Sequence, residues 1–194
     1  TPPTASNPAG VTVECIDDVP VADVSVVVDA SDNCTVSPVV AFVEDVSDGN
    51  TCPEIITRTY SVTDDCGNVT NLTQIITVND TTAPTALLVP LPWVVECVDE
   101  AIEADISVVA DAFDNCTAIP TVAFVSEVYD ENICPTYIIR TYSVTDDCDN
   151  SINLTQTIDV SDITPPTASN PANINIPLAP APAPDITVVT DAAD

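Results

Sequence analysis

Four cysteines recur at one constant spacing in two successive stretches of the chain, and this restricts the fold more than any other feature. Cys15, Cys34, Cys52 and Cys66 return about 82 residues later as Cys97, Cys116, Cys134 and Cys148, and the string TYSVTDDCGN returns as TYSVTDDCDN. A third copy begins at Thr164 with TPPTASNPA, the string that opens the chain. Repetition at a fixed period is typical of small modules in tandem. We therefore expect residues 1–81 and 82–163 to form two complete domains, and residues 164–194 an incomplete third repeat.

The charge of the chain limits its partners. Thirty-one acidic residues stand against two arginines, with no lysine or histidine, which gives a net charge of -29. Because nucleic acids and anionic membranes are bound through basic patches, neither is an expected partner. Hydrophobic residues nevertheless make up 45% of the chain, which is too many for a disordered acidic tail. The sequence thus predicts folded acidic domains whose small cores need additional stabilisation.

The cysteines indicate an oxidising environment, because regularly spaced cysteines in small domains are usually paired in disulfides. A zinc site is disfavoured, since the chain has no histidine and no cysteines spaced as CxxC. No stretch approaches the roughly 20 apolar residues of a transmembrane helix, and the chain does not open with the basic, apolar pattern of a signal peptide. We expect an extracellular piece of a longer protein, without direct membrane insertion.

Short runs of valine, isoleucine and threonine are separated by proline, aspartate and asparagine, a pattern typical of strands. About 80 residues with so many short strands predict an all-β fold in which each repeat is a two-sheet, immunoglobulin-like β-sandwich. The expected strands of the first repeat are 11–15, 24–28, 36–46, 55–63 and 72–78, and those of the second are 94–97, 106–110, 121–128, 137–145 and 154–160.

Two arginines and four aromatic residues fall on these strands. Arg58 and Arg140 share a strand face with apolar residues, so each needs a carboxylate partner, for which we expect Glu14 and Glu96. The aromatic side chains are expected to pack in the cores, and they are Phe42, Tyr60, Phe124 and Tyr142.

The strand order predicts a pairing of the cysteines. A tight turn at Asp48 and Gly49 would make the flanking strands antiparallel, which places Cys34 and Cys66 at one end of the domain and the other two cysteines at the opposite end. Each bridge would contribute about 3 to 4 kcal/mol in the chain-entropy model, and the other two connectivities of each repeat stay open. The expected bridges all lie within single repeats, and they are Cys15–Cys52, Cys34–Cys66, Cys97–Cys134 and Cys116–Cys148.

Acidic and amide side chains gather in the loops expected at one end of each domain. Together with the linker they offer oxygen ligands for a calcium ion, which takes about six to eight of them. The alternative is that these are solvated turn residues, since Asp and Asn are common in turns. Enzyme activity is not expected, because no histidine or nucleophile accompanies the paired carboxylates. The calcium ligands that the sequence predicts are Asp80, Asp111, Asp114, Asp146 and Asp147.

The opening TPPTASNPA, the step DNC and the string TYSVTDDCGN before a short apolar strand resemble the tandem HYR-like, immunoglobulin-like repeats of very large surface proteins in gliding Bacteroidota. The resemblance covers essentially the whole chain, except that Leu178 in the third copy stands where Cys15 would align. It implies export by the type IX secretion system and display as a filament on the bacterial cell surface. It also implies surface polysaccharide or a substratum, and the motility machinery, as partners.

Two classes of function agree with these features. The first is the stalk of an adhesin used in surface attachment and gliding motility, in which the neighbouring repeats of the same chain are the closest partners. The second is a self-assembling extracellular filament or surface-layer protein, in which the incomplete third repeat donates strands to a neighbour.

Overall fold

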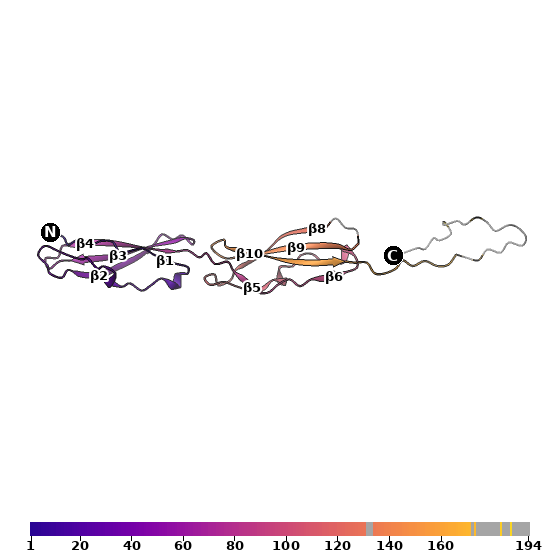
Figure 1. Cartoon of the computed structure of the whole chain (residues 1–194), viewed down its shortest axis with the longest axis horizontal. Coiled ribbons are helices and arrows are strands. Elements are labelled where there is room, and N and C mark those ends of the chain that lie inside the picture. The colour runs from indigo at the N-terminus through magenta and orange to yellow at the C-terminus, as the bar shows by residue number, and fades with distance from the viewer. Residues whose placement is uncertain (131–133, 172, 174–182, 184–186, 188–194) are drawn as a thin grey trace, which may run out of the picture. The chain divides into compact units, whose positions relative to one another are not determined.

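The computed structural model describes residues 1–130, 134–171, 173, 183 and 187, and it is built from strands joined by turns and single 3-10 turns (Figure 1). The expected all-β fold is confirmed, and the arrangement is consistent with a β-sandwich. The chain divides into two compact units. One comprises residues 1–91, 104–127 and 140–156, and the other comprises residues 92–103, 128–139 and the chain from 157 on. Most of the third repeat, Leu178 included, lies outside the described residues.

Four strands of the first repeat form one sheet in the order β1-β4-β3-β2. β3 (Glu54–Thr63) pairs antiparallel with both β2 (Val39–Ser47) and β4 (Val69–Val78). The short β1 (Val11–Val13) pairs parallel with the end of β4. These strands form where Val, Ile and Thr alternate with polar residues, as expected for a sheet with one buried face.

One face of this sheet carries the core of the first repeat. Tyr60 and Val62 of β3 are fully buried and pack with Leu72 of β4. In the part of the chain that the structure describes, no second long strand packs on them in the same cluster. Instead, Val27 and its neighbours pack on the sheet from an irregular segment that includes two 3-10 turns and one isolated bridge, Thr4 with Ser31. The two turns are η1 (Ile16–Asp18) and η2 (Val24–Val26).

A polar layer crosses this buried face between two apolar clusters. Arg58 is 3% exposed and donates from Nε and Nη2 to the two carboxylate oxygens of Asp45, both at 2.8 Å. This hydrogen bonding by Asp45 is the main cause that raises the pKa of Arg58. Gln74, opposite Arg58 in the register, donates from Nε2 to the carbonyl of Ala9 at 2.8 Å. The predicted partner Glu14 is therefore wrong, because Asp45 lies directly across the strand pair from Arg58.

The second repeat follows the same plan, with a four-stranded sheet in the order β6-β10-β9-β8 and a separate pair formed by β5 and β7. Arg140 again lies on the buried face and pairs with Glu127 at 2.6 Å, so the predicted partner Glu96 is also wrong. The strands are β5 (Thr85–Leu88), β6 (Trp93–Val95), β7 (Ala110–Phe113), β8 (Thr121–Tyr129), β9 (Thr136–Thr145) and β10 (Ser151–Val160), and the 3-10 turns are η3 (Val98–Glu100) and η4 (Ile106–Val108).

Eight of the ten expected strands are present within a few residues, and two are wrong. Residues 24–28 and 106–110 begin as the 3-10 turns η2 and η4 instead. The side chain of Asp23 accepts the N–H of Ser25 at 2.9 Å, and Asp105 accepts that of Ser107 at the same distance. These local hydrogen bonds compete with a sheet ladder and cap a turn instead.

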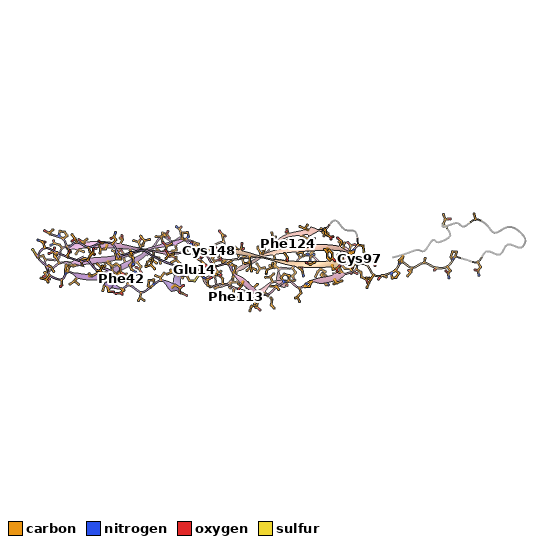
Figure 2. The ribbon with its side chains drawn as sticks, in the orientation of Figure 1. Glu14, Phe42, Cys97, Phe113, Phe124 and Cys148 are labelled. Atoms are coloured by element: carbon orange, nitrogen blue, oxygen red, sulfur yellow. A yellow bond between two sulfur atoms is a disulfide. The ribbon has the colours of Figure 1, made fainter. Side chains whose placement is uncertain are left out.

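The aromatic residues divide by type. Tyr60 and Tyr142 are fully buried, as predicted. Phe42 and Phe124, which Figure 2 labels, are 44% and 42% exposed, so their expected place inside the cores is wrong. Each phenylalanine instead meets the ring of its neighbouring tyrosine at a steep angle, with ring centres 6.4 Å apart in the first repeat and 5.9 Å in the second.

Candidate functional site: the junction between the repeats

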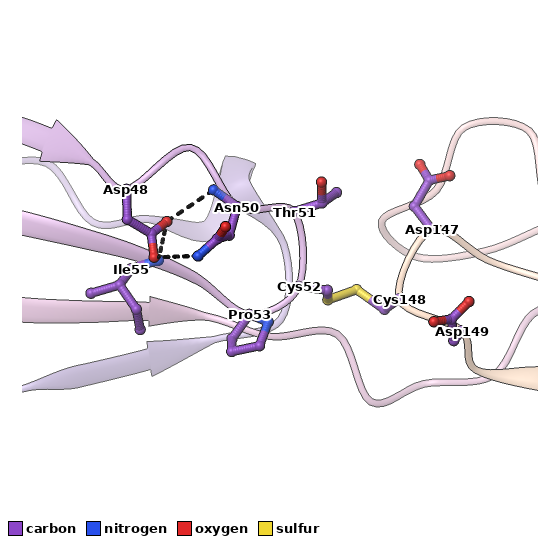
Figure 3. A pocket seen from close by; sticks show the side chains of 9 residues that line it. All are labelled: Asp48, Asn50, Thr51, Cys52, Pro53, Ile55, Asp147, Cys148 and Asp149. Carbon is purple, nitrogen blue, oxygen red and sulfur yellow. Dashed lines mark hydrogen bonds between the residues drawn. A yellow bond between two sulfur atoms is a disulfide. The ribbon is translucent and has the colours of Figure 1, made fainter.

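Two disulfides join the first repeat to the second, and both lie within the first compact unit. Cys15 is bonded to Cys116 and Cys52 to Cys148, with Cα atoms 5.1 and 5.3 Å apart. Figure 3 shows the second of these bonds between the hairpin loop that follows β2 and the loop that follows β9. The predicted pairing is therefore wrong: these four cysteines are bridged, but each bridge crosses from one repeat to the next.

The sheet order explains why Cys15 does not bond to Cys52. The two cysteines do lie at the same end of the domain, as predicted. Cys15 follows β1 and Cys52 precedes β3, and the strand residues Val13 and Glu54 are both register partners of Val78. But β4 lies between β1 and β3. Strands are spaced by about 4.8 Å, so backbones on either side of a third strand are about 9–10 Å apart. A disulfide needs Cα atoms within about 7 Å, and the two thiols reach partners in the next repeat instead.

The other four cysteines form no disulfide within the described residues, and all are exposed. The predicted bridges Cys34–Cys66 and Cys97–Cys134 are thus also absent from the structure, and so is the expected bridge Cys116–Cys148. The free thiols belong to the loops at the other end of the first repeat and to the loops that follow β6 and β8 in the second.

Glu14 organises the polar contacts beside the Cys15–Cys116 bond. Thr81 and Thr82 of the linker donate their hydroxyls to its two oxygens at 3.0 and 2.7 Å. Asn115 of the second repeat donates from Nδ2 to Glu14 Oε2 at 3.2 Å, and the sulfur of Cys116 accepts from the same nitrogen at 3.0 Å. The hydroxyl of Thr82, followed by that of Thr81, is the main cause that lowers the pKa of Glu14.

Two carboxyl groups meet on the inner side of this junction. Asp80 of the linker is 4% exposed, and its Oδ2 has no hydrogen-bond partner among the described residues; Oδ1 of Asp114 is buried in the same way. The two side chains lie in one group whose ligand atoms are within 4.8 Å of one another. Burial is the main cause that raises the pKa of Asp80, and Asp114 adds to the shift. For Asp114, burial acts upward but is outweighed by the N–H groups of Thr117 and Cys116, and its pKa is lowered.

Only part of the predicted calcium ligand set comes together. Asp80 and Asp114 offer two unpartnered oxygens, and the third member of their group, Cys116, is held in a disulfide and offers no thiolate. Asp146 already accepts three hydrogen bonds from Cys148 and Asn150 of its own loop. Asp111, at the exposed positive-φ position of β7, and Asp147 are not members of this group. The described carboxylates thus fit a cation with two oxygens, fewer than calcium takes, and calcium stays a prediction.

The backbone around this site is tied to the linker. Asn150 donates from Nδ2 to the carbonyl of Asp80 at 3.1 Å, and Thr82 donates its N–H to Asp80 Oδ1 at 3.0 Å. A small cavity of about 250 Å³ lies between the two disulfides and is lined by both. A second, about 430 Å³, borders the Cys52–Cys148 bond (Figure 3). There Asp48 accepts hydrogen bonds from Asn50 and Ile55, which fixes the loop that carries Cys52.

Sequence reasoning missed the roles of three polar residues here. The amide nitrogen of Asn115 bridges the two repeats by its hydrogen bond to Glu14, and Thr81 and Thr82 fix the linker to Glu14. The available signal is the asparagine before the second cysteine of each repeat, in DNC at 32–34 and 114–116. That signal does not distinguish a donor of hydrogen bonds from a metal ligand.

One family model matches the first repeat. Residues 3–78 match the family model of an HYR-like domain with 4 cysteines. HYR-like domains are extracellular repeats of adhesion type, and this agrees with the disulfides and with a general role as a surface repeat. No helix in the described part of the chain has the length and apolar character needed to cross a membrane. No curated protein matches the chain.

Proposed function

We propose that this chain is part of the repeat stalk of a large bacterial cell-surface adhesin used in surface attachment and gliding motility, of the kind that the sequence motifs resemble in the gliding adhesin SprB. The observation that carries the proposal is the pair of disulfides between successive repeats. A stalk has to transmit a pull from its tip to the cell, and two covalent bonds across the junction do so without relying on the linker peptide alone.

The linker and the charge support the same role. Glu14 holds the linker residues Thr81 and Thr82 against the repeat that precedes them, and Asn115 of the repeat that follows donates to Asp80 of the linker. A net charge of -29 keeps such repeats soluble and opposes lateral association between stalks. Export by the type IX system, and surface polysaccharide and the motility machinery as partners, enter the proposal from the sequence resemblance.

The test is made on intact cells of the source organism. Antibodies raised against the oxidised 194-residue chain should label the cell surface, and bivalent antibody should reduce attachment and gliding while the monovalent fragment has a weaker effect. Labelling that appears only after the cells are opened would overturn the proposal. Unchanged gliding on cells that the antibody coats would separate surface display from motility and would refute the motile part.

The alternative class, a self-assembling filament or surface layer, is separated by electron microscopy of the purified chain. Single threads or isolated particles are expected for a stalk. Laterally ordered polymers that survive reduction of the disulfides would favour strand donation between chains and would contradict the stalk.

A further inference from the structure

The free cysteines occupy positions whose counterparts in the other repeat are bonded. Cys34 and Cys66, here called the leading pair, correspond to Cys116 and Cys148 in the second repeat. Cys97 and Cys134, here called the trailing pair, correspond to Cys15 and Cys52 in the first repeat. The junction in the structure therefore joins the trailing cysteines of one repeat to the leading cysteines of the next. The leading pair of the first repeat and the trailing pair of the second form no such bond within the described residues.

The loops of the leading pair are folded as they are in the formed junction. The N–H of Cys34 donates to Asp32 Oδ2 at 2.8 Å, and that of Cys66 donates to Asp64 Oδ1 at 2.9 Å. The two loops are tied together by the N–H of Asp65, which donates to Thr35 Oγ1 at 3.0 Å. The bonded loops have the same three hydrogen bonds: Cys116 to Asp114 at 2.9 Å, Cys148 to Asp146 at 2.8 Å, and Asp147 to Thr117 at 3.0 Å.

The leading end has the same kind of buried, unpartnered carboxyl oxygen as the formed junction. Oδ1 of Asp32 is buried and has no hydrogen-bond partner among the described residues. Its counterpart in the second repeat is Oδ1 of Asp114, which lies in one group with Asp80 from the preceding linker. A repeat placed before the first would bring its own linker aspartate to Asp32, and its glutamate to Asn33, the counterpart of Asn115.

The trailing end has already folded its linker. Thr164 donates its hydroxyl to Glu96 at 2.8 Å and its N–H to Asp162 Oδ1 at 2.9 Å. In the formed junction, Thr82 makes the same two bonds to Glu14 and Asp80, at 2.7 and 3.0 Å. Asp130 likewise accepts the N–H of Tyr137 at 2.9 Å, as Asp48 accepts that of Ile55 at 3.2 Å.

We propose that the leading pair and the trailing pair are the two halves of a repeating covalent junction, and that the partner of each is another four-cysteine repeat of this type. In the order set by the formed junction, a trailing Cys97 bonds to a leading Cys34 and a trailing Cys134 to a leading Cys66. The proposal goes beyond the adhesin role and does not depend on it, because it concerns only what these two ends bind.

Each bond forms by thiol–disulfide exchange with a small-molecule disulfide, such as oxidised glutathione, as the oxidant. The thiolate of Cys97 attacks one sulfur of the oxidant, and one glutathione thiolate leaves. The thiolate of Cys34 from the other copy then attacks the Cys97 sulfur of the mixed disulfide, and the second glutathione thiolate leaves. Two cysteine thiols are oxidised, one oxidant disulfide is reduced to two thiols, and the two protons pass to the glutathione thiolates or to solvent.

Slightly alkaline solution favours the reaction. Partial loss of hydration, followed by the negative charges of Glu100, Asp162, Glu96 and Asp99, raises the pKa of the Cys97 thiol above its ordinary value. Since only the thiolate attacks, the exchange should be faster at about pH 8.5 than at about pH 7.

The experiment uses two variants of the full 194-residue chain, each with one half removed. Cys97→Ser/Cys134→Ser keeps only the leading pair, and Cys34→Ser/Cys66→Ser keeps only the trailing pair. Both retain the two internal disulfides, and their melting curves serve as the check that they fold. The variants are incubated in a glutathione redox buffer, singly and mixed, separated on non-reducing gels, and mapped by acid-specific proteolysis and mass spectrometry.

The mixture should give a disulfide-linked one-to-one dimer that a reducing agent separates into monomers. Mapping should show Cys97 joined to Cys34 and Cys134 joined to Cys66. Each variant alone should stay monomeric, and the unaltered chain should give a ladder of multimers. Absence of the mixed dimer, the crossed pairing of Cys97 with Cys66, or equal dimerisation of the single variants would overturn the proposal. Mapping of the unaltered chain gives a second, independent answer: bridges Cys34–Cys66 or Cys97–Cys134 within one copy would also overturn it.

Discussion

Arg58 and Asp45 form a two-pronged ion pair across neighbouring strands, in which the side chain of Arg58 is 4% exposed while that of Asp45 is 34% exposed. The two partners therefore differ in what they leave behind when one is removed. A lone Asp45 can be hydrated, whereas a lone Arg58 remains a buried charge.

We predict that Asp45→Ala destabilises the first repeat by about 2–3 kcal/mol, because it leaves the buried guanidinium without its carboxylate partner. Arg58→Met should cost less, since the methionine fills the apolar space and Asp45 turns to water. Urea unfolding of the two variants measures this difference. A larger loss for Arg58→Met would show that the arginine stem, and not its charge, is the main contribution.

The second prediction concerns pH and Asp80. Its pKa is raised in the folded junction, mainly by burial, so the folded state favours the protonated form. Stability from this group is therefore complete below the ordinary pKa of 3.8 and is lost as pH rises through the raised value. Asp80→Asn should remove that loss and raise stability at pH 7 by about 1 kcal/mol, with no gain below about pH 3.5.

Melting curves of the unaltered chain and of Asp80→Asn, recorded from pH 3 to 8, measure this difference in stability. The control is Asp18→Asn, an exposed carboxylate on η1. A gain for Asp80→Asn that is the same at every pH would contradict the link to protonation.

Calcium gives the third prediction. If a divalent ion occupies the oxygens of Asp80 and Asp114, millimolar Ca²⁺ should raise the melting temperature while NaCl of equal ionic strength does not. Asp80→Asn should abolish the effect, and Asp111→Asn and Asp147→Asn separately test the wider ligand set that the sequence predicts. If calorimetry detects no Ca²⁺ binding at millimolar concentration, the calcium prediction is wrong. A proton shared between the two carboxyl groups would then explain why they lie so close together.

The disulfide connectivity gives the fourth prediction, which uses the fact that trypsin has only Arg58 and Arg140 to cut. In the variant Cys34→Ser/Cys66→Ser, denatured but not reduced, bridges between repeats keep residues 1–58 attached to both later fragments. A bridge between Cys15 and Cys52 would instead release residues 1–58 as a separate peptide. Alkylation of the remaining thiols before digestion guards against exchange.

The sheet could be predicted where the pattern is local. β3 and β4 follow from alternating Val, Ile and Thr, and the turn at Asp48 and Gly49 follows from residue type, with Gly49 at φ 76°. The strand predicted at 24–28 is wrong because valines alone are typical of a strand. The contact that favours a 3-10 turn there is the hydrogen bond from the N–H of Ser25 to the side chain of Asp23.

The contacts that define the candidate site could not be predicted from spacing. Because the same cysteine pattern occurs in both repeats, the spacing cannot tell whether a cysteine bonds within its own repeat or to the next one. The position of β4 between β1 and β3 is what rules out the bond between Cys15 and Cys52. The partner of Arg58 depends on a shift of register between Phe42 and Glu44, which brings Asp45 opposite Arg58. Irregularities of this kind leave no clear mark in the residue pattern.

Mechanical load would take an unexpected route through this molecule. Between Cys66 and Cys148 the shortest covalent path is not the main chain between them; it runs back along β3 to Cys52 and crosses the disulfide to Cys148. The residues of β3 are already extended, and an extended chain can lengthen no further than about 3.3–3.6 Å per residue. A force applied at those two points is therefore borne by one taut strand and one sulfur–sulfur bond. Everything from β4 to β9 stays slack, and it can unfold and refold without changing the length of the path that carries the tension.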